Sequence, residues 1–166
     1  MGLSMQTLAL QLFNNKNRPF FRFFLSGKPV TALIDSGAET PVWCKGEEKF
    51  KEVYPQAKKL DWKCELRGFG VGAETALVYV IPNFELTDGT ATYRINNLHV
   101  AVCDHPLIGC DFVMSDTMFA KTKTLINRIG NKWAEIHFEK DCYYCAVRRG
   151  AGKFNIITFA QDEVQN

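Results

Sequence analysis

The sequence lacks the long hydrophobic run, the strong charge and the dense cysteines that define several common protein classes. No apolar run approaches the roughly 20 residues that span a bilayer, and the first ten residues, MGLSMQTLAL, lack the basic start and long apolar centre of a secretory signal. The formal net charge is only +2, which gives no electrostatic reason to bind nucleic acid or an anionic membrane. Six cysteines in 166 residues do not make a disulfide scaffold. We therefore expect a cytoplasmic protein with reduced thiols that binds neither nucleic acid nor a membrane.

The sequence does contain enough apolar material for one folded core. Of its residues, 46% are hydrophobic and 23% are charged, which is typical of a single globular domain. Its 13 phenylalanines and 12 glycines lie among short apolar runs, and long helical patterns are few. This pattern favours a mostly β architecture.

Turn residues divide the apolar runs into strands and hairpins. Ser26-Gly27-Lys28 and Asp88-Gly89 each fall between two β-prone stretches, which predicts a hairpin turn at both places. The expected strands and hairpins cover residues 5–13, 18–35, 63–81, 84–102 and 123–138. Residues 105–119 pass from an apolar run into the best short helix of the sequence, and Pro55 limits residues 45–59 to a loop or a short helix.

The composition changes near residue 140. A paired-cysteine tract, a basic glycine-containing linker and one last apolar run follow. We expect a domain over residues 1–140 and a C-terminal extension over residues 141–166, whose role the sequence does not indicate.

One stretch, VTALIDSGAETPVW at residues 30–43, places an acid where an apolar run ends. The first five residues favour a strand, and the Asp-Ser-Gly that follows favours a turn. Asp35 therefore stands where a buried strand breaks. Such an aspartate is either part of a capping turn or part of a site.

Three segments in order resemble the retropepsins, the single-domain aspartic protease class of retroviruses and retrotransposons. The segments are ALIDSGA (32–38), a glycine-tipped hairpin (66–72) and PLIGCDF (106–112), and the resemblance covers roughly residues 5–138. Asp35-Ser36-Gly37-Ala38 matches the Asp-Ser/Thr-Gly-Ala signature of that family. Leu107-Ile108-Gly109 matches its apolar-apolar-Gly segment. The resemblance implies an all-β, retropepsin-like, closed or barrel-like acid-protease fold with one short C-terminal helix, assembled as a homodimer.

The resemblance also implies a role for each matched residue. Asp35 would be catalytic, and Ser36, Gly37 and Ala38 would support the catalytic loop. The glycine-tipped hairpin would be the flap that closes over an extended peptide, bound as an added strand. The flap residues would be Gly68, Phe69, Gly70, Val71 and Gly72.

The motif occurs once, although the mechanism of the family needs two aspartates. Thr87-Asp88-Gly89 is no second copy, because it lies in a polar turn without an apolar run before it. The second Asp35 should come from an identical copy related by a twofold axis. The sequence thus predicts a homodimeric aspartic endopeptidase, without cofactor or metal, that cuts extended peptides such as a polyprotein or its own ends. The alternative is a catalytically weak or inactive module of the same fold that binds peptides and dimerises.

Other signals point elsewhere but are weaker. GFGVGA (68–73) fits a dinucleotide-binding pattern, yet a β-prone run follows it where a helix is needed. Cys142 and Cys145 with His137 could bind zinc, but a single Cys-x-x-Cys lacks its second ligand pair. Asp111 is interpreted as a structural carboxylate. The remaining cysteines, Cys44, Cys64, Cys103 and Cys110, are expected to be small core residues.

Overall fold

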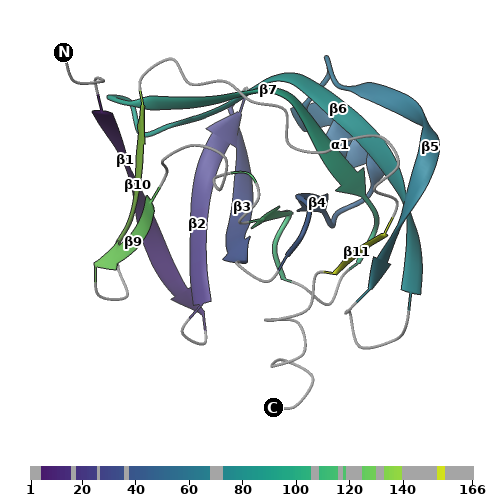
Figure 1. The fold of residues 1–166 in the computed structure, drawn as a ribbon, viewed down its shortest axis with the longest axis horizontal. Coiled ribbons are helices and arrows are strands. Elements are labelled where there is room, and N and C mark those ends of the chain that lie inside the picture. Colours follow the sequence, from purple (N-terminus) through teal and green to yellow (C-terminus); the bar gives the residue numbers. More distant parts are fainter. Residues whose placement is uncertain are drawn as a thin grey trace.

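The computed structural model describes residues 5–15, 18–25, 27–35, 38–67, 73–105, 109–115, 118, 125–129, 133–139 and 153–155 (Figure 1). Its strands are β1 (Met5–Asn15), β2 (Arg18–Leu25), β3 (Lys28–Asp35), β4 (Val42–Trp43), β5 (Lys58–Arg67), β6 (Ala73–Thr87), β7 (Thr92–Val102), β8 (Phe112–Ser115), β9 (Leu125–Ile129), β10 (Trp133–Glu139) and β11 (Lys153–Asn155). Its helix is α1 (Glu47–Val53). The mostly β architecture expected from the sequence is confirmed.

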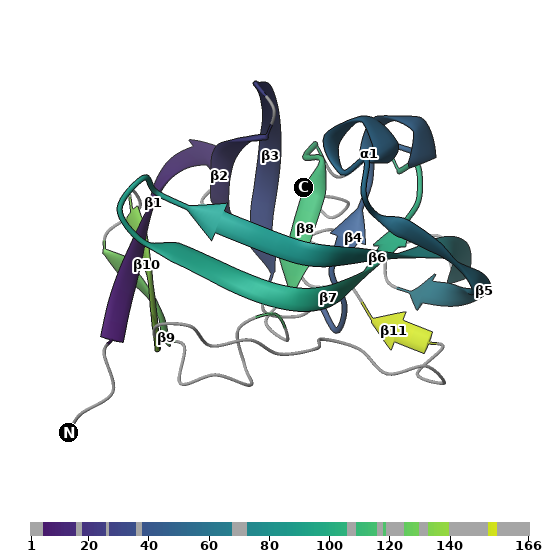
Figure 2. The same ribbon diagram turned by 90° about the horizontal axis from the view of Figure 1, so that it is seen from above.

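The strands form one sheet in the order β11-β5-β6-β7-β4-β8-β3-β2-β1-β10-β9. The order has two ends, β11 and β9, so the described strands make a curved but open sheet (Figures 1 and 2). The expectation of a closed barrel therefore does not hold for the described residues. Closure needs the two terminal strands to pair with each other, and here they lie at opposite ends of the strand order.

Two expected hairpin turns are present. Gly27 joins β2 to β3 with a φ of 76°, a conformation that glycine adopts without steric cost. In the turn between β6 and β7, the Asp88 side chain accepts hydrogen bonds from the backbone N–H groups of Thr90 and Ala91, both at 2.8 Å. A short acidic side chain that bonds to the following backbone is typical of such turns.

Strand β6 continues through a proline that could have ended it. Its ladder with β7 pairs Ile81 with Leu98 and Asn83 with Asn96, so that Pro82 stands opposite Asn97. Asn97 adopts a left-handed φ of 54°. Because proline has no N–H to donate, the irregularity is local and the pairing resumes on both sides.

The core is centred on aromatic rings around β4. Trp43 packs edge-to-face against Phe50 of α1, against Tyr54 just after the helix, and against Phe112 of β8, with ring centroids 5.6 to 6.4 Å apart. Its indole N–H donates to the carbonyl of Gly46 at 3.0 Å. These contacts fix the helix onto β4 (Figure 2). The helix ends at Val53, before Pro55, in agreement with the short helix allowed by the sequence.

Four cysteines are buried and unbridged, as expected for small core residues. The pairing of β4 with β7 continues beyond the strands, because the Cys103 N–H donates to the Trp43 carbonyl at 2.9 Å. A hydrogen bond with Cys103, together with burial, holds the pKa of the Cys44 thiol well above its ordinary value. Burial raises the pKa of Cys64 to about 11. Both thiols are therefore protonated at neutral pH.

Of the segment 105–119, in which a short helix is expected, residues 105, 109–115 and 118 are described. Phe112–Ser115 is strand β8, and Met118, described alone between 116 and 124, is helical. The boundary near residue 140 stays a prediction, although β11 pairs in parallel with β5 and thus joins the same sheet. Among the described helical residues, no segment has the length and apolar character needed to cross a membrane.

Candidate active site

Asp35 is the last residue of β3, at the point where a buried strand leaves the sheet. Strand β3 pairs antiparallel with β2 on one side and parallel with β8 on the other. In the second ladder Asp35 pairs with Ser115. The preceding residues Leu33 and Ile34 belong to the hydrophobic core, and the Asp35 side chain is itself only 4% exposed. Asp35 is thus placed by a strand that pairs with β2 up to Leu33 and with β8 through Asp35 itself.

The chain turns immediately after Asp35. The Ala38 N–H donates to the Asp35 carbonyl at 3.2 Å, which closes a four-residue turn of the kind the Asp-Ser-Gly sequence predicts. Ala38 is 2% exposed and packs in the core. Ser36 and Gly37 lie outside the described residues.

The segment that matches the apolar-apolar-Gly pattern of the family ends at Gly109, just before β8. Gly109 has a φ of 61°, in the left-handed region that side chains disfavour, and a Cβ added there would contact nothing within 4 Å. The requirement for glycine at this position is therefore conformational and not one of space. Leu107 and Ile108 lie outside the described residues.

Asp111 ties β3 to the segments around it. Its carboxylate oxygen Oδ2 accepts from the Thr31 N–H at 2.9 Å, and its own N–H donates to the Thr31 carbonyl at the same distance. Its carbonyl accepts from the Cys44 N–H at 2.8 Å. Three hydrogen bonds thus connect Asp111 to the middle of the strand that carries Asp35 and to the residue that follows β4.

The hairpin expected to be the flap is formed by β5 and β6. Cys64 pairs with Ala76 and Arg67 with Ala73, so the two strands converge on the glycine-containing tip. The five predicted flap residues, Gly68, Phe69, Gly70, Val71 and Gly72, lie outside the described residues. Close to the tip, Glu74 pairs with Leu66, and its carboxylate oxygen lies 3.5 Å from Nε2 of His105.

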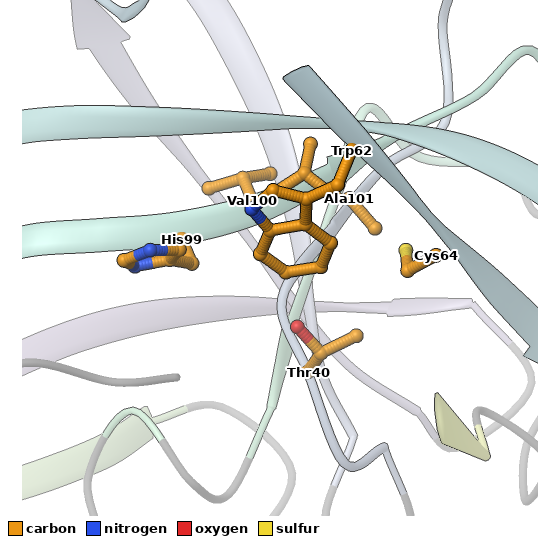
Figure 3. A pocket seen from close by; sticks show the side chains of 7 residues that line it. Thr40, Trp62, Cys64, His99, Val100 and Ala101 are labelled. Atoms are coloured by element: carbon orange, nitrogen blue, oxygen red, sulfur yellow. The ribbon is translucent and has the colours of Figure 1, made fainter. Parts of the chain in front are cut away.

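A hollow that the sequence analysis did not anticipate lies between this hairpin and β7. The space within it is about 180 Å³ when the solvent at its open mouth is included, and no part of it is wide enough to hold a water molecule. Its lining is mainly apolar, with one hydroxyl and one imidazole: Thr40, Trp62, Cys64, Val78, His99, Val100 and Ala101 (Figure 3). Thr40 comes five residues after Asp35, but the others come from three strands that only tertiary pairing brings together. No local sequence signal marks them.

A cluster of hydrogen-bonded and charged side chains lies at the start of α1. The Tyr79 hydroxyl donates to the Glu47 carboxylate, and Nζ of Lys59 lies 3.2 Å from the same oxygen. The hydrogen bond from Tyr79, and then the contact with Lys59, lower the pKa of Glu47. Burial and the bond to Glu47 raise the pKa of Tyr79 to about 12. This cluster connects α1 to both strands of the hairpin.

The described part of the chain contains no group of three or more His, Cys, Asp or Glu side chains arranged to hold a metal ion. Cys142 and Cys145, the predicted weak zinc candidates, lie outside that part.

No curated protein matches this chain. Among solved structures, it is similar to the crystal structure of a retropepsin-like aspartic protease from Rickettsia conorii, at 12% identity and a TM-score of 0.49, over 83% of this chain and 96% of that chain. The sequence pattern of the family described as "Retroviral aspartyl protease" matches residues 15–118, which is more than half of the chain and includes Asp35. On the strength of that match, the chain belongs to the retroviral aspartyl protease family.

Proposed function

We propose that the chain is an aspartic endopeptidase in which Asp35 supplies one of two catalytic carboxylates. The observation that carries this proposal is the place of Asp35: a buried acid at the end of β3, paired with Ser115 of β8, within the span that matches the family. A carboxylate in such a setting has a fixed direction and little competing water, which suits it to act on a bound substrate.

The reaction needs two acids with opposite tasks. One ionised carboxylate accepts a proton from a water molecule, which attacks the carbonyl carbon of the peptide, while the protonated partner donates to the carbonyl oxygen. When the tetrahedral intermediate collapses, the C–N bond breaks and a proton passes to the leaving amine. No metal, cofactor or covalent bond to the protein takes part.

One chain offers one such motif, so the second acid is proposed to be Asp35 of an identical copy. Two ionised carboxylates about 3 Å apart would repel by roughly 5 kcal/mol at an effective dielectric constant of about 20. The pair therefore keeps one proton, and its titration belongs to both groups together. Activity should accordingly follow a bell-shaped dependence on pH.

The substrate is proposed to be an extended peptide bound as an added strand beneath the β5–β6 hairpin, with a polyprotein or the ends of this chain as substrates. In this proposal the residues 68–72 at the tip of the hairpin form the flap. Ser36 and Gly37 support the catalytic turn, and residues 1–140 form the protease domain.

The direct test replaces the proposed catalytic acid by its amide. Asp35→Asn keeps the size of the side chain but removes the base, so hydrolysis of a peptide library should fall by at least about a thousandfold, with the thermal unfolding midpoint retained. Glu52→Gln is the matched control, because Glu52 is an exposed acid whose contact is a 3.5 Å ion pair with Lys28. It should leave hydrolysis unchanged.

Dilution tests the need for two copies. If the site is shared, specific activity falls as the protein is diluted below the dissociation constant of the dimer. Activity that is independent of concentration, in a species whose solution mass is that of one chain, would refute the shared site. A wild type that binds peptides and never cuts them would favour the alternative, an inactive peptide-binding module.

A further inference from the structure

The C-terminal strand β11 lies on the outer edge of the hairpin that the proposed function places over the substrate. It pairs in parallel with β5, with Lys153 opposite Glu65, Phe154 opposite Leu66 and Asn155 opposite Arg67. Arg67 is the last described residue of β5 before the tip. Figure 1 shows β11 beside the lower end of β5, far from β9 and β10. The tail therefore touches the hairpin directly beside its tip.

Near its tip the hairpin has two outer edges. The inner edge of β5 pairs with β6, but β7 pairs with β6 only from Leu77 to Thr87, so β7 does not cover the outer edge of β6 at residues 73–76. An extended peptide that adds to the first strand of the hairpin must pair with the outer edge of β5. That edge, at residues 65–67, is the one occupied by β11. The tail and an added peptide cannot both pair with these residues.

The chain is long enough to reach this edge within one molecule. Strand β10 ends at Glu139, and 13 residues separate it from Lys153. When extended, that length spans up to about 46 to 50 Å, whereas a compact domain of this size is roughly 40 Å across. The segment can thus cross from one end of the strand order to the other.

The paired segment is short, with three residues on each strand. Glu65 and Arg67 on β5 are partly exposed and form an ion pair, with 3.2 Å between Oε1 and Nε. The register places Lys153 opposite Glu65 and Asn155 opposite Arg67. Because only three residue pairs form, a longer peptide can displace the segment.

We propose that Lys153–Asn155 is an intramolecular occupant of the peptide-binding edge of β5, and that an extended peptide binds by displacing it. The proposal rests on the proposed function for the idea that substrates add to this hairpin. The apparent affinity for a peptide is then reduced by the fraction of molecules whose edge is covered. The tail would make the site selective for peptides that outcompete it.

The test uses the full chain with prolines in β11. Alternate residues of a parallel strand donate to the neighbouring strand, so one variant is Phe154→Pro and the other combines Lys153→Pro with Asn155→Pro. One of the two removes the N–H groups that reach β5. Gln165→Pro adds a proline to the same tail ten residues beyond the paired segment and serves as the control.

The first measurement is amide hydrogen exchange at residues 65–67, which does not depend on catalysis. In one proline variant, the β5 amides that face β11 should exchange about tenfold faster or more, while β6 and β7 keep their wild-type rates. The Gln165→Pro control should match the wild type. Unchanged exchange at residues 65–67 in both β11 variants would overturn the proposal.

The second measurement is the binding of a synthetic peptide with the sequence of residues 150–160, GAGKFNIITFA. Binding is measured with proteins that also carry Asp35→Asn, so that the peptide is not cleaved. The peptide should bind the effective proline variant about tenfold more tightly than the chain with its own tail intact. Equal affinities would overturn the proposal. A protein that cleaves no peptide would count against the proposed function instead, because neither measurement requires cleavage.

Discussion

Asp111 offers a sharp distinction between a structural acid and a catalytic one. Its Oδ2 accepts from the Thr31 N–H at 2.9 Å, and Thr31 lies on the same strand as Asp35. A hydrogen bond to an ionised group contributes about 1.5 to 3 kcal/mol to stability. Since both residues are half-buried, water can replace part of the bond, and we expect Asp111→Ala to cost about 2 kcal/mol. For a chain of this length, that loss lowers the thermal unfolding midpoint by roughly 4 to 8 °C.

The assay is thermal unfolding at one fixed protein concentration, followed by peptide hydrolysis well below the midpoint. Asp111→Asn keeps an oxygen acceptor and loses only the charge, so its midpoint should lie between those of Asp111→Ala and the wild type. Glu52→Ala, which removes an exposed ion pair, is the control and should stay within about 0.5 kcal/mol of the wild type. Folded Asp111→Ala should retain hydrolysis. A variant that unfolds at the wild-type temperature but cannot cleave would refute the structural role.

Two further predictions concern the interior. Tyr79→Phe removes the largest cause of the lowered pKa of Glu47. A carboxyl group whose pKa is lowered by folding stabilises the folded state at pH values above its ordinary pKa of about 4.3. This stabilisation is lost as the pH falls through the pKa of the folded state. Denaturant unfolding should therefore show a larger loss of stability in Tyr79→Phe at pH 7 than at pH 3, and equal losses would contradict the assignment. Cys44 and Cys64, buried and with raised pKa values, should resist iodoacetamide in the folded protein, as read by mass spectrometry; labelling at the rate of an unfolded control would contradict this.

Local sequence signals predicted the antiparallel parts of the fold well. The glycine at position 27 and the Asp88-Gly89 pair specify tight turns, so the two hairpins they join follow from neighbouring residues alone. The end of β3 was also predictable, because an apolar run that meets Asp-Ser-Gly has few ways to continue.

The parallel contacts were beyond local reasoning. The pairing of β3 with β8 and of β4 with β7 has no connecting turn, and its register depends on the packing of Trp43 and Phe112 in the core. The same holds for β11, because its three residues are too few to predict a strand from the sequence. The hollow beside Thr40 was missed for the same reason, since its lining exists only after the strands have paired. The family resemblance gave Asp35 its proposed role, but the pairing of Asp35 with Ser115 became visible only in the structure.

The strand order also sets when this fold can be completed during translation. Strand β3 rests against β8, and Thr31 and Asp111, which join them, are 80 residues apart. At synthesis rates of about 5 to 20 residues per second, the second partner emerges roughly 4 to 16 seconds after the first. Strand β1 waits longer still, because its partner β10 begins at Trp133. A ribosome-bound chain therefore contains Asp35 several seconds before it contains β8, the strand that pairs with Asp35.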